Sequence, residues 1–211
     1  MIYMMEFLKN NIELPDRSTV TNKGDAGRVL VIGSDIGMCG AAAFSALGAY
    51  RTGCGLVYVY THIENRIPMH TLVPEAVLSF WQNDDESFTT LKKLLDRVDA
   101  VVLGVGFGTG DFSRKIFLKT LEFCRKPLVI DADGLNLLAK ERALLSRLPE
   151  NTILTPHLLE LARLADVDVS AVKKDTTGVL KNTFENVRVA VAAKSDKTVI
   201  LLPNKETLFV R

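Results

Sequence analysis

The sequence has few cysteines, and those that it has show no pairing pattern. Its 211 residues include only Cys39, Cys54 and Cys124, which form no C-x-x-C motif and leave one thiol without a partner. This number and spacing favour free thiols in a reducing compartment over a framework of disulfides. We therefore expect a cytoplasmic protein whose cysteines pack as small apolar side chains.

Long apolar runs and an excess of charge of one sign are also absent. The N-terminal apolar run contains Glu6 and Lys9 and is too short for a signal peptide. The uncharged run 36–50 is too short and too rich in glycine to cross a bilayer. The formal net charge is +1, with acids and bases interspersed, so no basic face for nucleic acid is indicated. We expect small-molecule partners, and neither nucleic acid nor a membrane.

What the sequence does contain is a series of short apolar strands, each followed by a glycine turn or a helix-compatible segment. Strands are predicted at 28–33, 56–61, 100–104, 127–131 and 151–155, with a helix of small residues at 40–53. This alternation predicts an α/β fold, a mainly parallel central sheet flanked by helices on both faces. Three further strands, 189–194, 198–203 and 207–211, indicate antiparallel pairing at the C-terminal end. The length suits a single domain over 1–211.

Two glycine-rich segments follow predicted strands, where the ligands of a parallel sheet collect. The first, GSDIGMCGA at 33–41, lets backbone amides approach a phosphate or a ribose. It departs from G-x-G-x-x-G, so a Rossmann dehydrogenase that uses Glu64 as its acid is only one alternative, and helix packing on the sheet is another. The second, GVGFGTGD at 104–111, can form a nest of amide donors for an anion.

Carboxylates and a histidine follow the later strands. Asp131 and Asp133 share one face by the two-residue period of a strand, and such a pair can bind hydrated magnesium or hold a substrate hydroxyl. We assign Asp131 to the site and Asp133 to the cap of a helix beginning near Gly134. His157 and Glu160 are three residues apart on one helical face. A purely structural histidine is the alternative to a functional one here.

The order of these motifs resembles a known family. NKGDAGRVLVIGSDIGMCGAAAFSALGAYRTGCGLVYVYT is followed by PEAV, GVGFG, DADGLN, TPHLLELARL and KSDKT. From about Asn22 onward this succession is similar to the ADP/ATP-dependent NAD(P)H-hydrate dehydratases, a branch of the ribokinase-like superfamily. The resemblance implies a ribokinase-like fold and a repair reaction in which a nucleotide phosphate drives loss of water from hydrated NADH or NADPH. Phosphoryl transfer to the ring hydroxyl, aided by Mg²⁺, would make it a good leaving group.

The resemblance also implies roles for particular residues. Those matching the family positions that line the hydrated cofactor are Ala41, Gly106 and His157. The segment matching the binding site for ADP or ATP comprises Lys194, Ser195, Asp196, Lys197 and Thr198. Glu160 matches an acid that works with magnesium through water, and we add Asp131 as a second candidate for that role.

The sequence departs from the family pattern at several positions. Val105 replaces a proline, Leu158 and Leu159 replace a proline-glycine pair, and Ser195 replaces a glycine where the backbone approaches a phosphate. The family continues beyond the strand at 207–211 with a G-[ST]-G-D turn that supplies an anion hole and the catalytic aspartate, whereas this sequence stops at Arg211. We therefore expect a C-terminally truncated member whose catalysis is impaired.

The only GTGD of the sequence is 108–111, and by its position we interpret Asp111 as a chance similarity and not as a substitute base. Two alternatives to the dehydratase stay open. One is a non-catalytic protein that binds adenine nucleotide, and the other is a ribokinase-like kinase of a small vitamin precursor. Such kinases resemble TPN where this sequence has TPH. The resemblance also implies a homo-oligomer, in which another subunit covers apolar surface.

Overall fold

The computed structural model describes residues 22–210, which divide into two compact units, a first unit of residues 22–137 and a second of residues 138–210. The apolar run with Glu6 and Lys9 lies outside the described residues, as does Arg211 at the end of the last predicted strand. The assignment of 1–211 to a single domain stays a prediction. Within 22–210, no helix combines the length and the apolarity that a membrane span requires.

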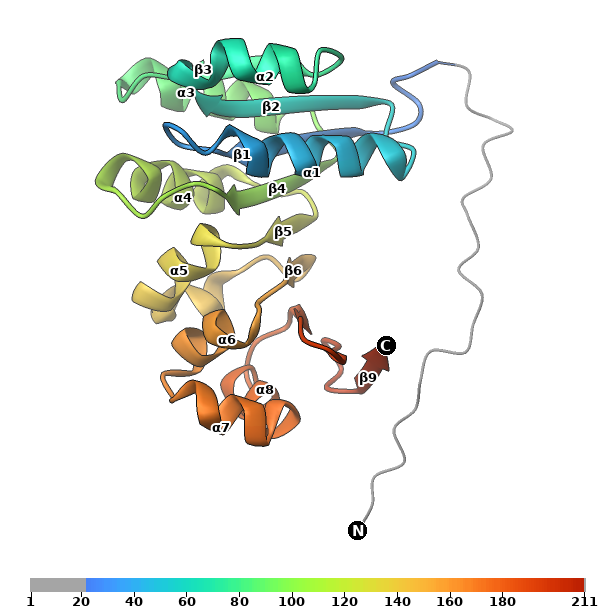
Figure 1. The fold of residues 1–211 in the computed structure, drawn as a ribbon, viewed down its shortest axis with the longest axis vertical. Coiled ribbons are helices and arrows are strands. Elements are labelled where there is room, and N and C mark those ends of the chain that lie inside the picture. The colour runs from blue at the N-terminus through green and yellow to red at the C-terminus, as the bar shows by residue number, and fades with distance from the viewer. Residues whose placement is uncertain (1–21, 211) are drawn as a thin grey trace. The chain divides into compact units, whose positions relative to one another are not determined.

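The first unit contains five parallel strands (Figure 1). They are β1 (Arg28–Gly33), β2 (Leu56–His62), β3 (Val77–Trp81), β4 (Ala100–Val105) and β5 (Leu128–Ile130), in the spatial order β3-β2-β1-β4-β5. Its helical segments are α1 (Cys39–Arg51), η1 (Ile63–Asn65), α2 (Arg66–Leu72), α3 (Asp85–Leu95), α4 (Asp111–Phe123) and the start of α5 (Asp133–Lys140). Four of these strands confirm the sequence prediction, and β3 was missed.

The strand order fixes where the helices lie. From β1 to β3 the chain moves outward in one direction, and it then returns past β1 to β4 and β5. Because parallel crossovers are right-handed, α1 and α2 cover one face of these strands, and α3 and α4 cover the other (Figure 1). The direction of travel reverses between β1 and β4. Loops that leave the carboxyl ends of these two strands flank a topological switch point, where α/β sheets bind ligands.

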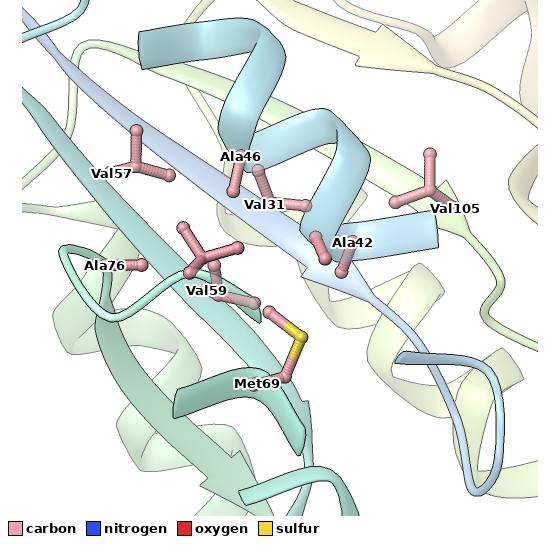
Figure 2. Packing of buried hydrophobic residues seen from close by; sticks show 10 residues of the cluster. Val31, Ala42, Ala46, Val57, Val59, Met69, Ala76 and Val105 are labelled. Atoms are coloured by element: carbon pink, nitrogen blue, oxygen red, sulfur yellow. The ribbon is translucent and has the colours of Figure 1, made fainter. Parts of the chain in front are cut away.

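Small side chains allow α1 to pack closely on the strands. Ala42 and Ala46 are fully buried one helical turn apart and lie over Val31 and Val59 (Figure 2). Met69 of α2 belongs to the same cluster and is also fully buried. Close packing at the start of α1 keeps the preceding loop near the carboxyl end of β1.

Aromatic side chains form a second buried cluster in the first unit. Phe107, which follows β4, contacts Trp81 edge-on with 5.7 Å between ring centroids, and Trp81 contacts Tyr60 in the same way at 5.1 Å. The Tyr60 hydroxyl donates to the carbonyl of Ser87 at 2.6 Å, and burial raises its pKa. The loop after β4 thus rests on aromatic rings contributed by β2 and β3.

The second unit combines four strands with short helices. Its strands are β6 (Thr152–Leu154), β7 (Ala190–Ala193), β8 (Thr198–Leu201) and β9 (Thr207–Val210), and its helices are η2 (Arg142–Arg147), α6 (Leu158–Ala165), α7 (Val169–Lys174) and α8 (Thr176–Thr183). β6 and β7 are parallel, whereas β7–β8 and β8–β9 are antiparallel. This confirms the predicted fold class, mainly parallel with antiparallel strands at the C-terminal end.

One buried hydroxyl in the second unit leads to a stability prediction. The Thr152 side chain is 1% exposed, and its hydroxyl has no hydrogen-bond partner among residues 22–210. Replacing it with valine removes an unpaired polar atom, so we expect Thr152→Val to raise the free energy of unfolding by about 1 kcal/mol in urea denaturation. The buried hydroxyl of Thr120 instead donates to the carbonyl of Ile116 at 2.8 Å. Thr120→Val should therefore lower the free energy of unfolding by about 1 kcal/mol. The same sign for both variants would contradict this.

Candidate functional site

The loops after β1 and β4 are joined at the switch point by main-chain hydrogen bonds. Ser34 donates its amide to the carbonyl of Val105, and Asp35 donates its amide to the carbonyl of Gly106, both at 2.8 Å. A Cβ on Gly33 would collide with the Val105 carbonyl, so glycine at this position permits the close approach. The two glycine-rich segments that the sequence analysis singled out therefore lie side by side.

Ala41 and Gly106, both predicted to contact the hydrated cofactor, are brought together by this arrangement. Gly106 has a φ of +59°, and a Cβ built on it would lie 3.0 Å from the Ala41 Cβ and 3.1 Å from the Met38 carbonyl oxygen. The absent side chain leaves backbone amides and a small methyl group at the carboxyl edge of β1 and β4. A dinucleotide can approach such a surface closely.

The GTGD segment connects the loop after β4 to the first residue of α4, and the carboxylate of Asp133 binds its first glycine. Gly108 has a φ of +69° and donates its amide to Asp133 Oδ2 at 2.9 Å. Gly110 is the N-cap residue of α4, and Asp111 is the exposed first residue of that helix. The start of a helix favours anions through its free amides. The interpretation of Asp111 as a chance similarity stays a prediction.

The two aspartates after β5 differ from their predicted arrangement. The strand ends at Ile130, and Ala132 has a φ of +53°, so Asp131 and Asp133 do not share a strand face. Asp133 is the first residue of α5, and its carboxylate binds the Gly108 amide and the Asn136 side-chain amide instead of capping a helix that begins at Gly134. Asp131 is half-buried, with its main chain hydrogen-bonded to Leu103 and Gly134.

In the second unit, His157 and Glu160 form a capping box at the start of α6. The Glu160 amide donates to His157 Nδ1 at 3.2 Å, and the His157 amide donates to Glu160 Oε2 at 2.9 Å. The other ring nitrogen, Nε2, lies 3.3 Å from Glu160 Oε1. The Glu160 side chain is 6% exposed, whereas that of His157 is 51% exposed. His157 therefore has a structural role and still presents an edge of its ring to solvent.

The predicted nucleotide segment begins beside this box and forms a turn. Lys194 donates its amide to the carbonyl of Pro156 at 2.8 Å and pairs with His157 in an isolated parallel bridge. The Ser195 hydroxyl donates to the Lys197 carbonyl at 2.8 Å and accepts from the Lys197 amide at 3.3 Å. Asp196 is exposed within the turn, and Thr198 begins β8. His157 and Lys194 are thus neighbours at the carboxyl ends of β6 and β7.

The side chains of the described residues provide no preformed metal cage. Within 22–210, no three His, Cys, Asp or Glu side chains are grouped so that they could hold a metal ion. The Glu160 carboxylate binds both the amide and the imidazole of His157. Magnesium commonly binds through one or two carboxylates together with substrate phosphates, and the residues present fit only that kind of site.

Sequence reasoning missed Thr61 and Asn65, which donate side-chain hydrogen bonds to the carbonyl of Ser34. Both are buried, Thr61 fully and Asn65 to 2% exposure. Nothing in their local sequence indicates this contact, because the carbonyl belongs to another element. The only available signal was the position of these polar residues, with Thr61 near the end of β2 and Asn65 just after it.

Comparisons with a family model and with individual proteins point to the same family. A sequence model described as NAD(P)H-hydrate dehydratase matches residues 29–211. The ADP-dependent (S)-NAD(P)H-hydrate dehydratase of Lactococcus lactis is 31% identical over 195 residues, which are 92% of this chain and 68% of that protein. The bifunctional NAD(P)H-hydrate repair enzyme Nnr of Escherichia coli is 34% identical over 190 residues, which are 89% of this chain and 34% of that enzyme. The chain thus spans about a third of the bifunctional enzyme.

Solved structures agree on the fold. A ribokinase-like superfamily protein of Enterococcus faecalis matches with a TM-score of 0.82 and 24% identity, covering 94% of this chain and 67% of that one. The ADP/ATP-dependent NAD(P)H-hydrate dehydratase of Bacillus subtilis, co-crystallised with ATP and Mg²⁺, matches with a TM-score of 0.76 and 24% identity, covering 93% and 68%. These similarities confirm the ribokinase-like fold that the sequence resemblance implied.

Proposed function

Because this chain belongs to the NAD(P)H-hydrate dehydratase family, we propose that it acts in the ADP- or ATP-dependent dehydration of hydrated NADH and NADPH. One observation carries the proposal. At the switch point of the first unit, Ala41 and Gly106 lie together on two loops joined by the Ser34–Val105 and Asp35–Gly106 hydrogen bonds. This surface suits the nicotinamide dinucleotide, because bare backbone there can approach a ribose or a phosphate.

The adenine nucleotide is assigned to residues 194–198 of the second unit. Lys194 supplies a positive charge for phosphate, and the Ser195 hydroxyl stabilises the turn by bonding to Lys197. Glu160 and Asp131 are the candidate acids toward Mg²⁺, which would neutralise charge on the transferring phosphoryl group. The assignment of His157 to the hydrated cofactor rests on the family resemblance alone.

We also propose that the protein is cytoplasmic and forms homo-oligomers. Two large apolar side chains of the first unit support self-association, since Phe44 on α1 is 77% exposed and Ile67 on α2 is 72% exposed. A non-catalytic nucleotide-binding protein is the alternative function. The two functions differ in one measurable property. Only the dehydratase recovers NADPH absorbance from the hydrate when ADP or ATP and Mg²⁺ are added.

Binding of each ligand tests the site assignments. We expect His157→Asn to weaken NADPH binding and Lys194→Met to weaken ADP binding in calorimetry, each by roughly tenfold or more, since each removes a hydrogen bond or charge at its ligand. Asparagine is a good N-cap residue, so the first variant keeps the start of α6. Methionine keeps the apolar stem of Lys194, and the amide bond to Pro156 is unaffected by the side chain.

Each variant serves as the control for the other. His157→Asn should bind ADP normally, and Lys194→Met should bind NADPH normally. Unchanged affinity for both ligands in both variants would contradict the assignments. Nucleotide-dependent recovery of NADPH absorbance would establish the dehydratase. Binding of NADPH and ADP without any recovery would instead favour the non-catalytic alternative.

A further inference from the structure

A single buried carbonyl, that of Ser34, accepts three hydrogen bonds. The Thr61 hydroxyl donates to it at 2.6 Å, the Asn65 side-chain amide at 2.7 Å, and the His62 main-chain amide at 3.3 Å. Ser34 and Thr61 are fully buried, and Asn65 is 2% exposed. Buried polar groups are hydrogen-bonded as a rule. A carbonyl oxygen has two lone pairs, so three donors are one more than it needs.

The residue that carries this carbonyl has an unusual backbone conformation. Ser34 has a φ of +64°, in the left-handed region that residues other than glycine, asparagine and aspartate seldom adopt. Surrounding structure must maintain such a conformation. The three donors come from the end of β2 and from η1, elements that follow in the chain, so the loop does not maintain this conformation by itself.

The Ser34 side chain transmits this geometry to the rest of the loop. Its hydroxyl donates to the Met38 carbonyl at 2.7 Å and accepts the Ala42 amide at 3.0 Å, which closes residues 34–38 onto the start of α1. Asn65 also donates to the Asp35 carbonyl at 3.1 Å, and it lies 3.0 Å from the Thr61 hydroxyl oxygen. The peptide between Ser34 and Asp35 thus donates its amide to Gly106 after β4 and accepts hydrogen bonds from the end of β2 and from η1 through its carbonyl.

We infer that Thr61 and Asn65 are positioning residues, which hold Ser34 in its left-handed conformation and thereby place the loop 34–38 against the β4–α4 loop in the geometry that the nicotinamide dinucleotide requires. The choice of ligand rests on the proposed function. The holding of the loop rests only on the hydrogen bonds above. Neither residue is among those assigned to the ligand, and their hydrogen bonds reach the loop through the carbonyls of Ser34 and Asp35.

The test compares two substitutions at one position. Thr61→Val keeps the shape of the side chain and removes the hydroxyl, whereas Thr61→Ser keeps the hydroxyl. We expect Thr61→Val to weaken NADPH binding about tenfold and to speed amide exchange at Ser34, Asp35 and Ala42, with Thr61→Ser close to wild type in both measurements. ADP affinity, assigned to the second unit, should be unchanged. Asn65→Leu, which is similar in size and lacks the donor amide, should reproduce the effects of Thr61→Val.

The two readouts separate the inference from the proposed function. Faster exchange confined to the loop in Thr61→Val and Asn65→Leu supports the positioning role even if the wild-type protein binds no NADPH, in which case the proposed function fails alone. Wild-type exchange in the loop and wild-type NADPH affinity in both variants would overturn the inference. It would also be overturned by faster exchange throughout the first unit, or by equal losses in Thr61→Ser, because either result indicates a general packing role.

Discussion

Gly104→Ala will lower the free energy of unfolding by about 3 to 5 kcal/mol, a large effect for the addition of one methyl group. Gly104 has a φ of +108°, and a Cβ on it would collide with the amide nitrogen of Gly134 and with the carbonyl oxygen of Asp131. The three nearest atoms belong to the main chain at the β5–α5 junction, so no side-chain rotation relieves the clash with them. The cost combines backbone strain with overpacking.

The matched control is the same substitution on α1. Gly48 is exposed within that helix, and nothing lies within 4 Å of a Cβ built on it. Alanine is favoured over glycine inside helices, so Gly48→Ala should raise the free energy of unfolding by about 0.5 to 1 kcal/mol. Urea denaturation followed by circular dichroism measures both variants. Similar effects of the two substitutions would show that the packing around Gly104 is looser than described.

Ala41→Leu will weaken NADPH binding by roughly 10- to 100-fold while the protein stays folded. Ala41 is half-buried near the start of α1. Gly106 lies beside it, and the absence of a side chain on Gly106 leaves space there. Leucine is a good helix former, so the helix tolerates it, but its larger side chain occupies the surface assigned to the dinucleotide. Overpacking of this kind costs about 1 to 3 kcal/mol, which corresponds to that change in affinity.

A leucine elsewhere on the same helix tests whether the effect is local. Gly48→Leu adds the same side chain about two turns further along α1, into open space. Calorimetry should give it wild-type affinity for NADPH, and both variants should bind ADP normally. Unchanged NADPH affinity in Ala41→Leu would remove Ala41 from the proposed site.

The sequence could predict the elements whose signal is local. Continuous apolar runs identified β1, β2, β4 and β5, and the antiparallel pairing of the last strands was also correct. β3 was missed because it is a partly exposed edge strand, with Val77 44% exposed and only Trp81 fully covered. An edge strand lacks the continuous apolar run of a central parallel strand.

The candidate site was predictable where a strand end and a glycine mark it. The glycine spacing predicted the two loops that meet at Ala41 and Gly106, and the TPH motif led to His157. Contacts between distant residues could not be predicted. Asp133 binds an amide 25 residues earlier in the chain, and Thr61 and Asn65 bind a carbonyl 27 and 31 residues earlier. Such partners are set by strand order, which local patterns do not encode.

The aromatic cluster gives the protein an intrinsic optical probe. Its sequence contains one tryptophan, Trp81, whose indole is 1% exposed and lies between the rings of Tyr60 and Phe107. Phe107 lies in the chain between Gly106 and Gly108, so a displacement of the β4–α4 loop that moves Phe107 changes the surroundings of the indole. Fluorescence emission from this single residue therefore reports the state of one loop of the proposed site, without an added label and without interference from a second tryptophan.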